Sequence, residues 1–133
     1  MYLRFQVFER DPDSQEPMGL FQAAWHLCDA GALAPWEEAR WREIARWFGA
    51  HLPRPDRAAR SGRPTAPDRA IFWFKASAVE HVSRMHEVVA LLEHHGVHSE
   101  VLRAERPGFI VYEDAFQVAA EPFRSEFRRS AAP

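Results

Sequence analysis

Histidine is the residue type in this sequence best suited to metal chemistry, since seven occur in 133 residues. His81 and His86 fall in a segment with helical periodicity, but they are five residues apart. Two metal ligands on one face of a helix need a spacing of about four residues, which places both imidazoles one turn apart. We therefore do not expect this pair to chelate a metal ion.

A denser cluster follows, consisting of His94, His95 and His98 with Glu93 and Glu100 beside them. Gly96 interrupts the cluster and is expected to end the helix, because glycine favours helix C-termini. The three histidines are the candidate metal ligands of a small metal-dependent enzyme. The alternative is a group of solvated side chains at a helix C-terminus, where the helix dipole favours histidine. We favour the alternative and expect no metal or other cofactor.

Nucleophilic catalysis needs a serine, threonine or cysteine with a base beside it. The single cysteine, Cys28, lies on the apolar stripe of a predicted helix, and His26, two positions away, points to another face. A buried cysteine behaves as a small hydrophobic residue. The sequence also lacks phosphate-binding glycine loops and the serine elbow of α/β-hydrolases. We predict no catalytic residue and favour a protein that is not an enzyme.

Glu113 and Asp114 are adjacent carboxylates, the kind of pair that acts as general acid and base in hydrolases. They fall in a predicted hairpin turn, where acidic residues are ordinary turn formers. Adjacent side chains in an extended chain also point apart. We interpret them as turn residues.

Residues 53–69, PRPDRAARSGRPTAPDR, combine four prolines with arginines at every third position. The prolines exclude a continuous helix or a central strand, so we expect a long loop. In an extended segment of about three residues per turn, such arginines share one side and meet phosphates or carboxylates together. The candidate anion-binding or partner-binding residues are Arg54, Arg57, Arg60, Arg63, Arg69 and Trp73. The alternative is a solvated loop whose arginines pair with acids elsewhere in the chain.

Charge is unevenly distributed along a chain whose formal net charge is −2. Residues 1–52 and 70–121 each carry eight acidic side chains, against five and four basic ones, whereas residues 53–69 carry five arginines and two aspartates. Dedicated nucleic-acid binders present a dominant basic surface. Nucleic acid is therefore a second choice of partner, after protein.

Composition places the chain among ordinary globular domains, with 47% apolar and 27% charged residues. A solitary cysteine makes no intramolecular disulfide, and the first residues lack the pattern of an export signal. No apolar stretch approaches the roughly 20 residues that cross a bilayer. We predict a cytoplasmic protein with no membrane partner.

Period-two alternation predicts a strand over residues 2–8, and helical spacing predicts helices over residues 18–29 and 35–52. Pro35 suits a first helical position, and the apolar stripe of that helix contains Trp41, Ile44, Ala45 and Phe48. Beyond the loop, AIFWFK at residues 70–75 is apolar on both faces, which is typical of a central strand. A third helix follows and ends near Gly96.

Strands are predicted over residues 97–103, 109–112 and 116–121, with turns between them. The last two links are expected to make antiparallel neighbours, and the helical crossover to make strands 70–75 and 97–103 parallel. The predicted fold is a single α+β domain over residues 1–121, in the order β-α-α-β-α-β-β-β, with a mixed, mostly antiparallel sheet of about five strands. Residues 122–133 are expected to be a flexible polar tail.

Three short segments carry a resemblance to a group of small bacterial proteins that have no assigned activity: Trp73-Phe74-Lys75, Arg106-Pro107-Gly108 and Tyr112-Glu113-Asp114. The resemblance spans most of the chain. It implies a self-standing domain and no particular reaction.

Two of the predicted strands are apolar on both faces, and three helices packed on one face of the sheet leave the other face to be covered. We therefore expect a non-enzymatic module that acts through a protein partner or by self-association, including a homodimer. The alternative is binding of nucleic acid or a phosphate ligand through loop 53–69. The third hypothesis is the metal-dependent enzyme.

Overall fold

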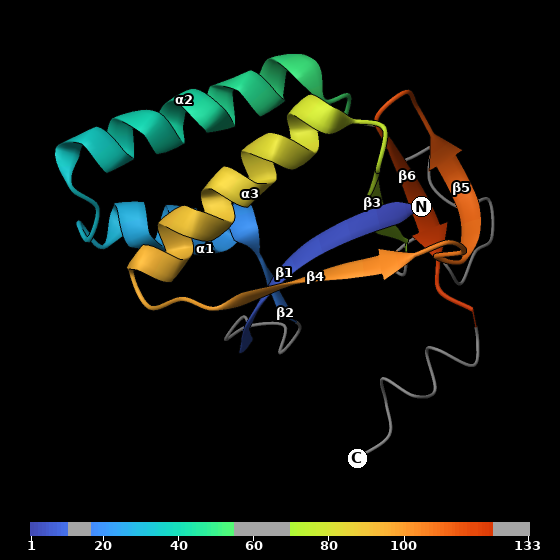
Figure 1. Cartoon of the computed structure of the whole chain (residues 1–133), viewed down its shortest axis with the longest axis horizontal. Helices are drawn as coiled ribbons and strands as arrows, with labels where there is room; N and C mark the ends of the chain where they lie inside the picture. The colour runs from blue at the N-terminus through green and yellow to red at the C-terminus, as the bar shows by residue number, and fades with distance from the viewer. Residues whose placement is uncertain (11–16, 55–69, 124–133) are drawn as a thin grey trace. The chain divides into compact units, whose positions relative to one another are not determined.

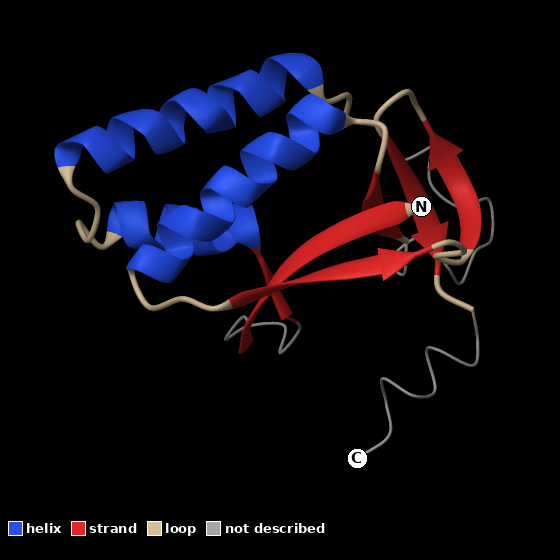
Figure 2. Ribbon diagram, in the orientation of Figure 1, coloured by secondary structure: helices blue, strands red, loops and turns tan. Residues whose placement is uncertain are grey.

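A computed structural model describes residues 1–10, 17–54 and 70–123. The described residues form three helices and six strands, which are drawn in Figures 1 and 2. In chain order the elements are β1 (Tyr2–Arg10), β2 (Pro17–Gly19), α1 (Leu20–Asp29), α2 (Pro35–His51), β3 (Ile71–Lys75), α3 (Val79–His94), β4 (Ser99–Ala104), β5 (Phe109–Glu113) and β6 (Gln117–Glu121). The predicted α+β class and element order are confirmed, and the short strand β2 is an addition.

The chain divides into two compact units. The sheet unit comprises Met1–Arg4, Pro53–Ala78 and Arg103–Pro133, and the helical unit comprises Phe5–Leu52 and Val79–Leu102. Strand β1 contributes residues to both units. Each unit is described in turn.

Within the sheet unit the strands are hydrogen-bonded in the order β1-β3-β6-β5. Leu3 pairs with Phe74, Trp73 with Val118, and Phe109 with Glu121, always antiparallel. Strand β3 lies between two neighbours, as its two apolar faces predict. All five residues of β6 are buried, and β6 lies between β3 and β5.

One prediction about strand neighbours is wrong. Strand β4 pairs with β1 and not with β5, so the turn at residues 105–108 is not a hairpin between paired strands. The physical reason lies in Gly108, whose backbone packs against the end of β6 and directs β5 onto that strand. The crossover through α3 joins two strands that are not adjacent in the sheet, because β3 pairs with β1 and β6.

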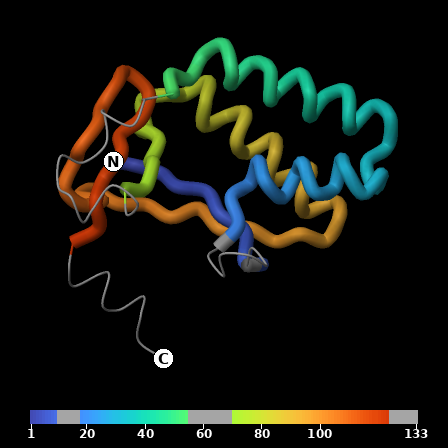
Figure 3. Tube along the Cα trace, turned by 180° about the vertical axis from the view of Figure 1, so that it is seen from behind, coloured from blue at the N-terminus to red at the C-terminus, as the bar shows by residue number. Residues whose placement is uncertain are grey.

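Three helices form the core of the helical unit, and Figures 1 and 3 show α2 and α3 side by side. The predicted stripe of α2 is buried at Trp41, Ile44 and Phe48. Val88 and Leu92 of α3 are also fully enclosed. In the same unit β1 pairs with β2 at Gln6 and Gly19, and the N–H of Phe8 donates to the carbonyl of His98 at 3.2 Å. None of the described helices has the length and apolar character needed to cross a membrane.

Gly108 is the position in the sheet unit that tolerates a side chain least. Its φ is +144°, and a Cβ there would lie 2.1 Å from the carbonyl oxygen of Glu121. We expect Gly108→Ala to lower the free energy of unfolding by more than about 2 kcal/mol, because backbone atoms must move. Urea denaturation measures the change.

Gly31→Ala is the matched control for that substitution. Gly31 also has a positive φ, of +70°, but a Cβ there meets no atom within 4 Å. The control is expected to lose about 1 kcal/mol, which reflects the backbone conformation alone. Equal losses in the two variants would show that the contact between Gly108 and Glu121 does not constrain the sheet.

Candidate functional site

The arginine cluster predicted from the sequence lies mostly outside the described residues. Arg57, Arg60, Arg63 and Arg69 are outside them, and Arg54, just after α2, is exposed. Trp73 lies half-buried on β3, paired with Val118. The described structure therefore places two of the six candidate residues and does not bring them together in one site.

The candidate metal ligands occupy the C-terminal end of α3 and the link to β4. His94 and His98 are exposed, whereas the Nε2 atom of His95 lies 3.0 Å from Oε1 of Glu37. Within residues 1–10, 17–54 and 70–123, no group of three or more His, Cys, Asp or Glu side chains is arranged to hold a metal ion. The partner of His95 is thus a carboxylate of another helix.

Glu37 links the beginning of α2 to the end of α3. It is 4% exposed, and its Oε1 accepts a hydrogen bond from the backbone N–H of Ala34 at 2.8 Å. This bond is the main reason why the pKa of Glu37 is lowered, and the contact with His95 lowers it further. Glu37 therefore caps the positive end of α2.

A buried histidine, His81, joins the other ends of the same helices. Its Nε2 lies 2.8 Å from the carbonyl oxygen of His51. The ring of Trp47 is stacked on His51 with centroids 4.4 Å apart, and the guanidinium of Arg84 lies 3.7 Å from the centroid of the Trp47 ring. Trp47 is thus in contact with both His51 and Arg84. This arrangement packs α2 against α3.

Cys28 is 7% exposed in the core of the helical unit. Its Sγ lies 3.4 Å from Nη2 of Arg42 and 3.5 Å from Oε1 of Glu38. Burial raises the pKa of the thiol, and the hydrogen bond to Glu38 raises it further. The neutral thiol is therefore favoured, which is the opposite of what a nucleophilic cysteine needs.

The carboxylates of Glu113 and Asp114 point to different partners. Glu113 forms an ion pair with Lys75 at 2.5 Å. Asp114 accepts hydrogen bonds from the Tyr112 hydroxyl at 2.7 Å and from the N–H groups of Phe116 and Gln117 at 2.8 and 3.1 Å. Burial opposes ionisation of Asp114, but these hydrogen bonds hold its pKa below the usual value. The pair shapes the β5–β6 turn.

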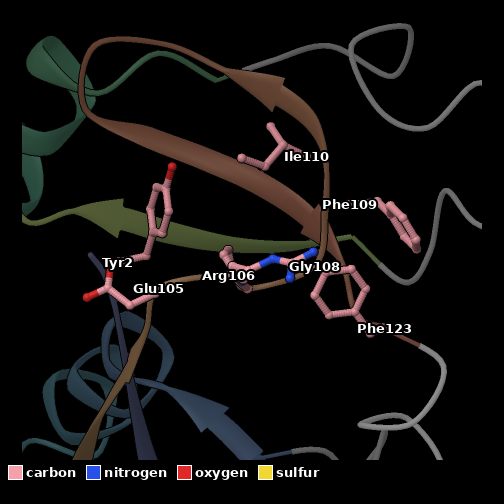
Figure 4. Close-up of a pocket in the computed structure, with 8 residues that line it drawn as sticks. Tyr2, Glu105, Arg106, Gly108, Phe109, Ile110 and Phe123 are labelled. Carbon is pink, nitrogen blue, oxygen red and sulfur yellow. The ribbon is translucent and has the colours of Figure 1, made fainter.

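A cavity of about 330 Å³ opens in the sheet unit where the chain enters β5. Figure 4 shows side chains from three separate parts of the sequence around it. Its apolar and aromatic walls are formed by Tyr2, Phe109, Ile110 and Phe123, and charged groups come from Glu105 and Arg106. Phe109 and Phe123 meet edge to face with centroids 4.9 Å apart. We call this cavity the β5 pocket.

The two charged residues of the β5 pocket have different surroundings. Oε2 of Glu105 lies 3.4 Å from the amino group of Met1. The guanidinium of Arg106 lies 5.4 Å from the ring centroid of Phe123, within the range of a cation–π contact. Among the described residues, no carboxylate forms an ion pair with Arg106. Its N–H groups are therefore available to an anionic ligand.

Strand β5 is the last strand of the described sheet on its side, with β6 as its only described neighbour. Phe109 and Ile110 are 49% and 45% exposed. The register shifts between Ile110 and Tyr112, so that Val111 has no partner on β6. An edge strand presents backbone N–H and C=O groups to any extended chain that approaches it.

The β5 pocket is the feature that sequence reasoning missed. Arg106, Pro107 and Gly108 stood out only as a shared turn, and Tyr2 and Phe123 lie more than 100 residues apart in the chain. The one available signal was the apolar character of FIVYE on both faces.

No family model, curated protein or solved structure matches this chain.

Glu37 gives the helical unit a stability that depends on pH. Because its folded pKa is lowered from 4.5, ionised Glu37 stabilises the fold above that pH, and the contribution is lost as the pH falls through the lowered value. We expect Glu37→Gln to destabilise the protein clearly at pH 7 and much less at about pH 3. Urea denaturation at the two pH values measures this.

Glu38→Gln is the matched control, since Glu38 lies in the same helical turn but its side chain is 43% exposed. It is expected to change stability little at either pH. A Glu37→Gln loss that is the same at both pH values would contradict the role given to the Glu37 carboxylate.

Proposed function

We propose that this protein is a non-enzymatic binding module that takes an extended segment of a partner protein as an added strand along β5. The observation that carries the proposal is the coincidence of an open edge strand with a pocket at its beginning. In strand addition, main-chain hydrogen bonds supply affinity and a neighbouring pocket selects side chains. Both elements are present in the sheet unit.

The residues of β5 support this use of the edge. Natural edge strands usually carry charges or prolines that block pairing. Within FIVYE, only Glu113 is charged, and Lys75 already neutralises it at 2.5 Å. The register shift between Ile110 and Tyr112 leaves Val111 without an opposite residue on β6, as at a β-bulge. The edge is thus chemically open on its first residues, next to the pocket.

The proposal also includes a cytoplasmic location in a bacterium. A solitary cysteine fits a reducing compartment. The resemblance to small bacterial proteins supports a bacterial source.

A second copy of this chain is the main competitor of a partner protein for the β5 edge.

Binding of nucleic acid or a phosphate ligand through loop 53–69 remains a separate proposal. Of its arginines, the described residues include only Arg54, which is exposed. Acidic side chains also prevail in residues 70–121. Steep weakening of binding with salt would identify such a ligand, because counterions are released from phosphates.

A metal-dependent enzyme built on His94, His95 and His98 has the least support, since His95 is held by Glu37.

Val111→Pro tests the edge directly. Val111 has no opposite residue on β6, so the proline is placed where pairing with β6 is already interrupted, and it removes an N–H from the edge strand. The probe is a phage-displayed library of random heptapeptides selected on the immobilised protein. We expect the parent protein and Val111→Ala, which keeps the N–H, to enrich peptides, and Val111→Pro to lose at least tenfold in affinity for them.

Ile110→Lys gives a second test that does not depend on proline. Ile110 is 45% exposed, so a charge is tolerated there but disfavours an apolar ligand. Circular dichroism verifies that each variant is folded. Peptides that bind the parent and Val111→Pro equally would contradict the proposal. So would a dimer, seen by light scattering, that Val111→Pro dissociates while no peptide is enriched.

A further inference from the structure

We infer that the segment bound along β5 carries an acidic side chain two residues from an aromatic or aliphatic one, with the acid on Arg106 and the apolar side chain in the β5 pocket. This inference rests on the proposed function and specifies the chemistry of its partner. It concerns one side chain of the partner and one of this protein, so it can fail while strand addition holds.

The first support is the state of Arg106. Its side chain is exposed, and the described structure gives it a ring contact with Phe123 at 5.4 Å but no ion pair. A cation–π contact of this kind leaves the N–H groups of the guanidinium free to donate. A carboxylate is the side chain that this planar fork binds through two hydrogen bonds. Arg106 lines the pocket and thus places such a donor beside it.

The second support is the neighbouring acid, Glu105. It precedes Arg106 in the chain, but its carboxylate lies 3.4 Å from the Met1 amino group. The nearest carboxylate in sequence is thus committed to another cation. Glu113, at the far end of β5, is committed to Lys75. Among the described residues, neither of these acids is paired with Arg106, and a carboxylate of the ligand fits there.

The third support is the size and lining of the pocket. A volume of about 330 Å³ lies at the lower end of the range for ligand sites, which suits one side chain better than a whole small molecule. Tyr2, Ile110 and Phe123 give it apolar and aromatic walls. An aromatic or aliphatic side chain binds most favourably there, because its own apolar surface and that of the pocket walls are both removed from water.

The spacing follows from strand geometry. Side chains two residues apart lie on the same face of an extended chain, at roughly 6.6 Å. Arg106 lines the same pocket as Ile110 and Phe123, so its ligand group is a neighbour of the pocket's occupant on one face. An acid at the adjacent position would point to the opposite face. The predicted pattern is therefore apolar-x-acid or acid-x-apolar.

The acidic surroundings restrict how much negative charge the site accepts. Glu105, Glu113 and Glu121 belong to the same unit, whereas Lys75 is paired with Glu113. A single carboxylate matches the one available guanidinium. A polyanion such as nucleic acid would meet several acids as well, which opposes its binding.

The experiment selects random heptapeptides on three proteins in parallel: the parent, Arg106→Gln and Arg103→Gln. Arg103 is the matched control, because it is exposed on β4 and does not line the pocket. We expect the parent and Arg103→Gln to enrich Asp or Glu two positions from an apolar residue. Arg106→Gln is expected to keep the apolar preference and lose the acidic one.

A quantitative version uses one enriched peptide and its Glu→Gln counterpart, measured by fluorescence polarisation. The parent should bind the Gln peptide about tenfold more weakly, because a charge-assisted hydrogen bond is lost. Arg106→Gln should bind both peptides equally. The same discrimination in Arg106→Gln, or enrichment without an acid, would overturn the inference and leave strand addition intact. Absence of any enriched peptide would overturn the proposed function and the inference together.

Discussion

The burial of β6 along its whole length is the constraint on which the sheet unit depends. A strand enclosed in this way must have both edges paired, since an unpaired backbone group away from water is costly. Strand β3 pairs with one edge and β5 with the other. No other described strand pairs with β5, so β5 is the edge strand on this side of the sheet. The candidate binding surface is thus a consequence of how β6 is covered.

Both ends of β5 are held in place by interactions with β6 and its turn. Gly108 packs its backbone against Glu121 at the beginning of β5, and Asp114 accepts four hydrogen bonds at its end. Gln117 adds a bond from its Nε2 to the carbonyl oxygen of Pro53 at 2.7 Å. A strand fixed in this way loses little conformational freedom when a ligand pairs with it, which favours affinity. The contacts with β6 and its turn therefore hold both the edge strand and the β5 pocket beside it.

Local elements could be predicted from the sequence, but the candidate site could not. Helix α2 follows from Pro35 and the stripe of Trp41, Ile44 and Phe48, because helical periodicity is a property of neighbours in the chain. The pairing of β4 with β1 is not local: it depends on which backbone edges remain after β6 is enclosed. The β5 pocket is not local either, since Tyr2, Arg106 and Phe123 meet only in the folded sheet. His95 was named as a candidate metal ligand, but its contact is with Glu37, which lies 58 residues away.

The central claim is that a ligand adds a strand to β5, and amide hydrogen exchange tests it most directly. Exchange is measured residue by residue on the full chain, free and saturated with a peptide selected from the library. Strand addition predicts slower exchange at alternate amides of β5, beginning at the pocket, because outward N–H groups become hydrogen-bonded. Unchanged β5 amides, with protection confined to the helical unit, would contradict the account.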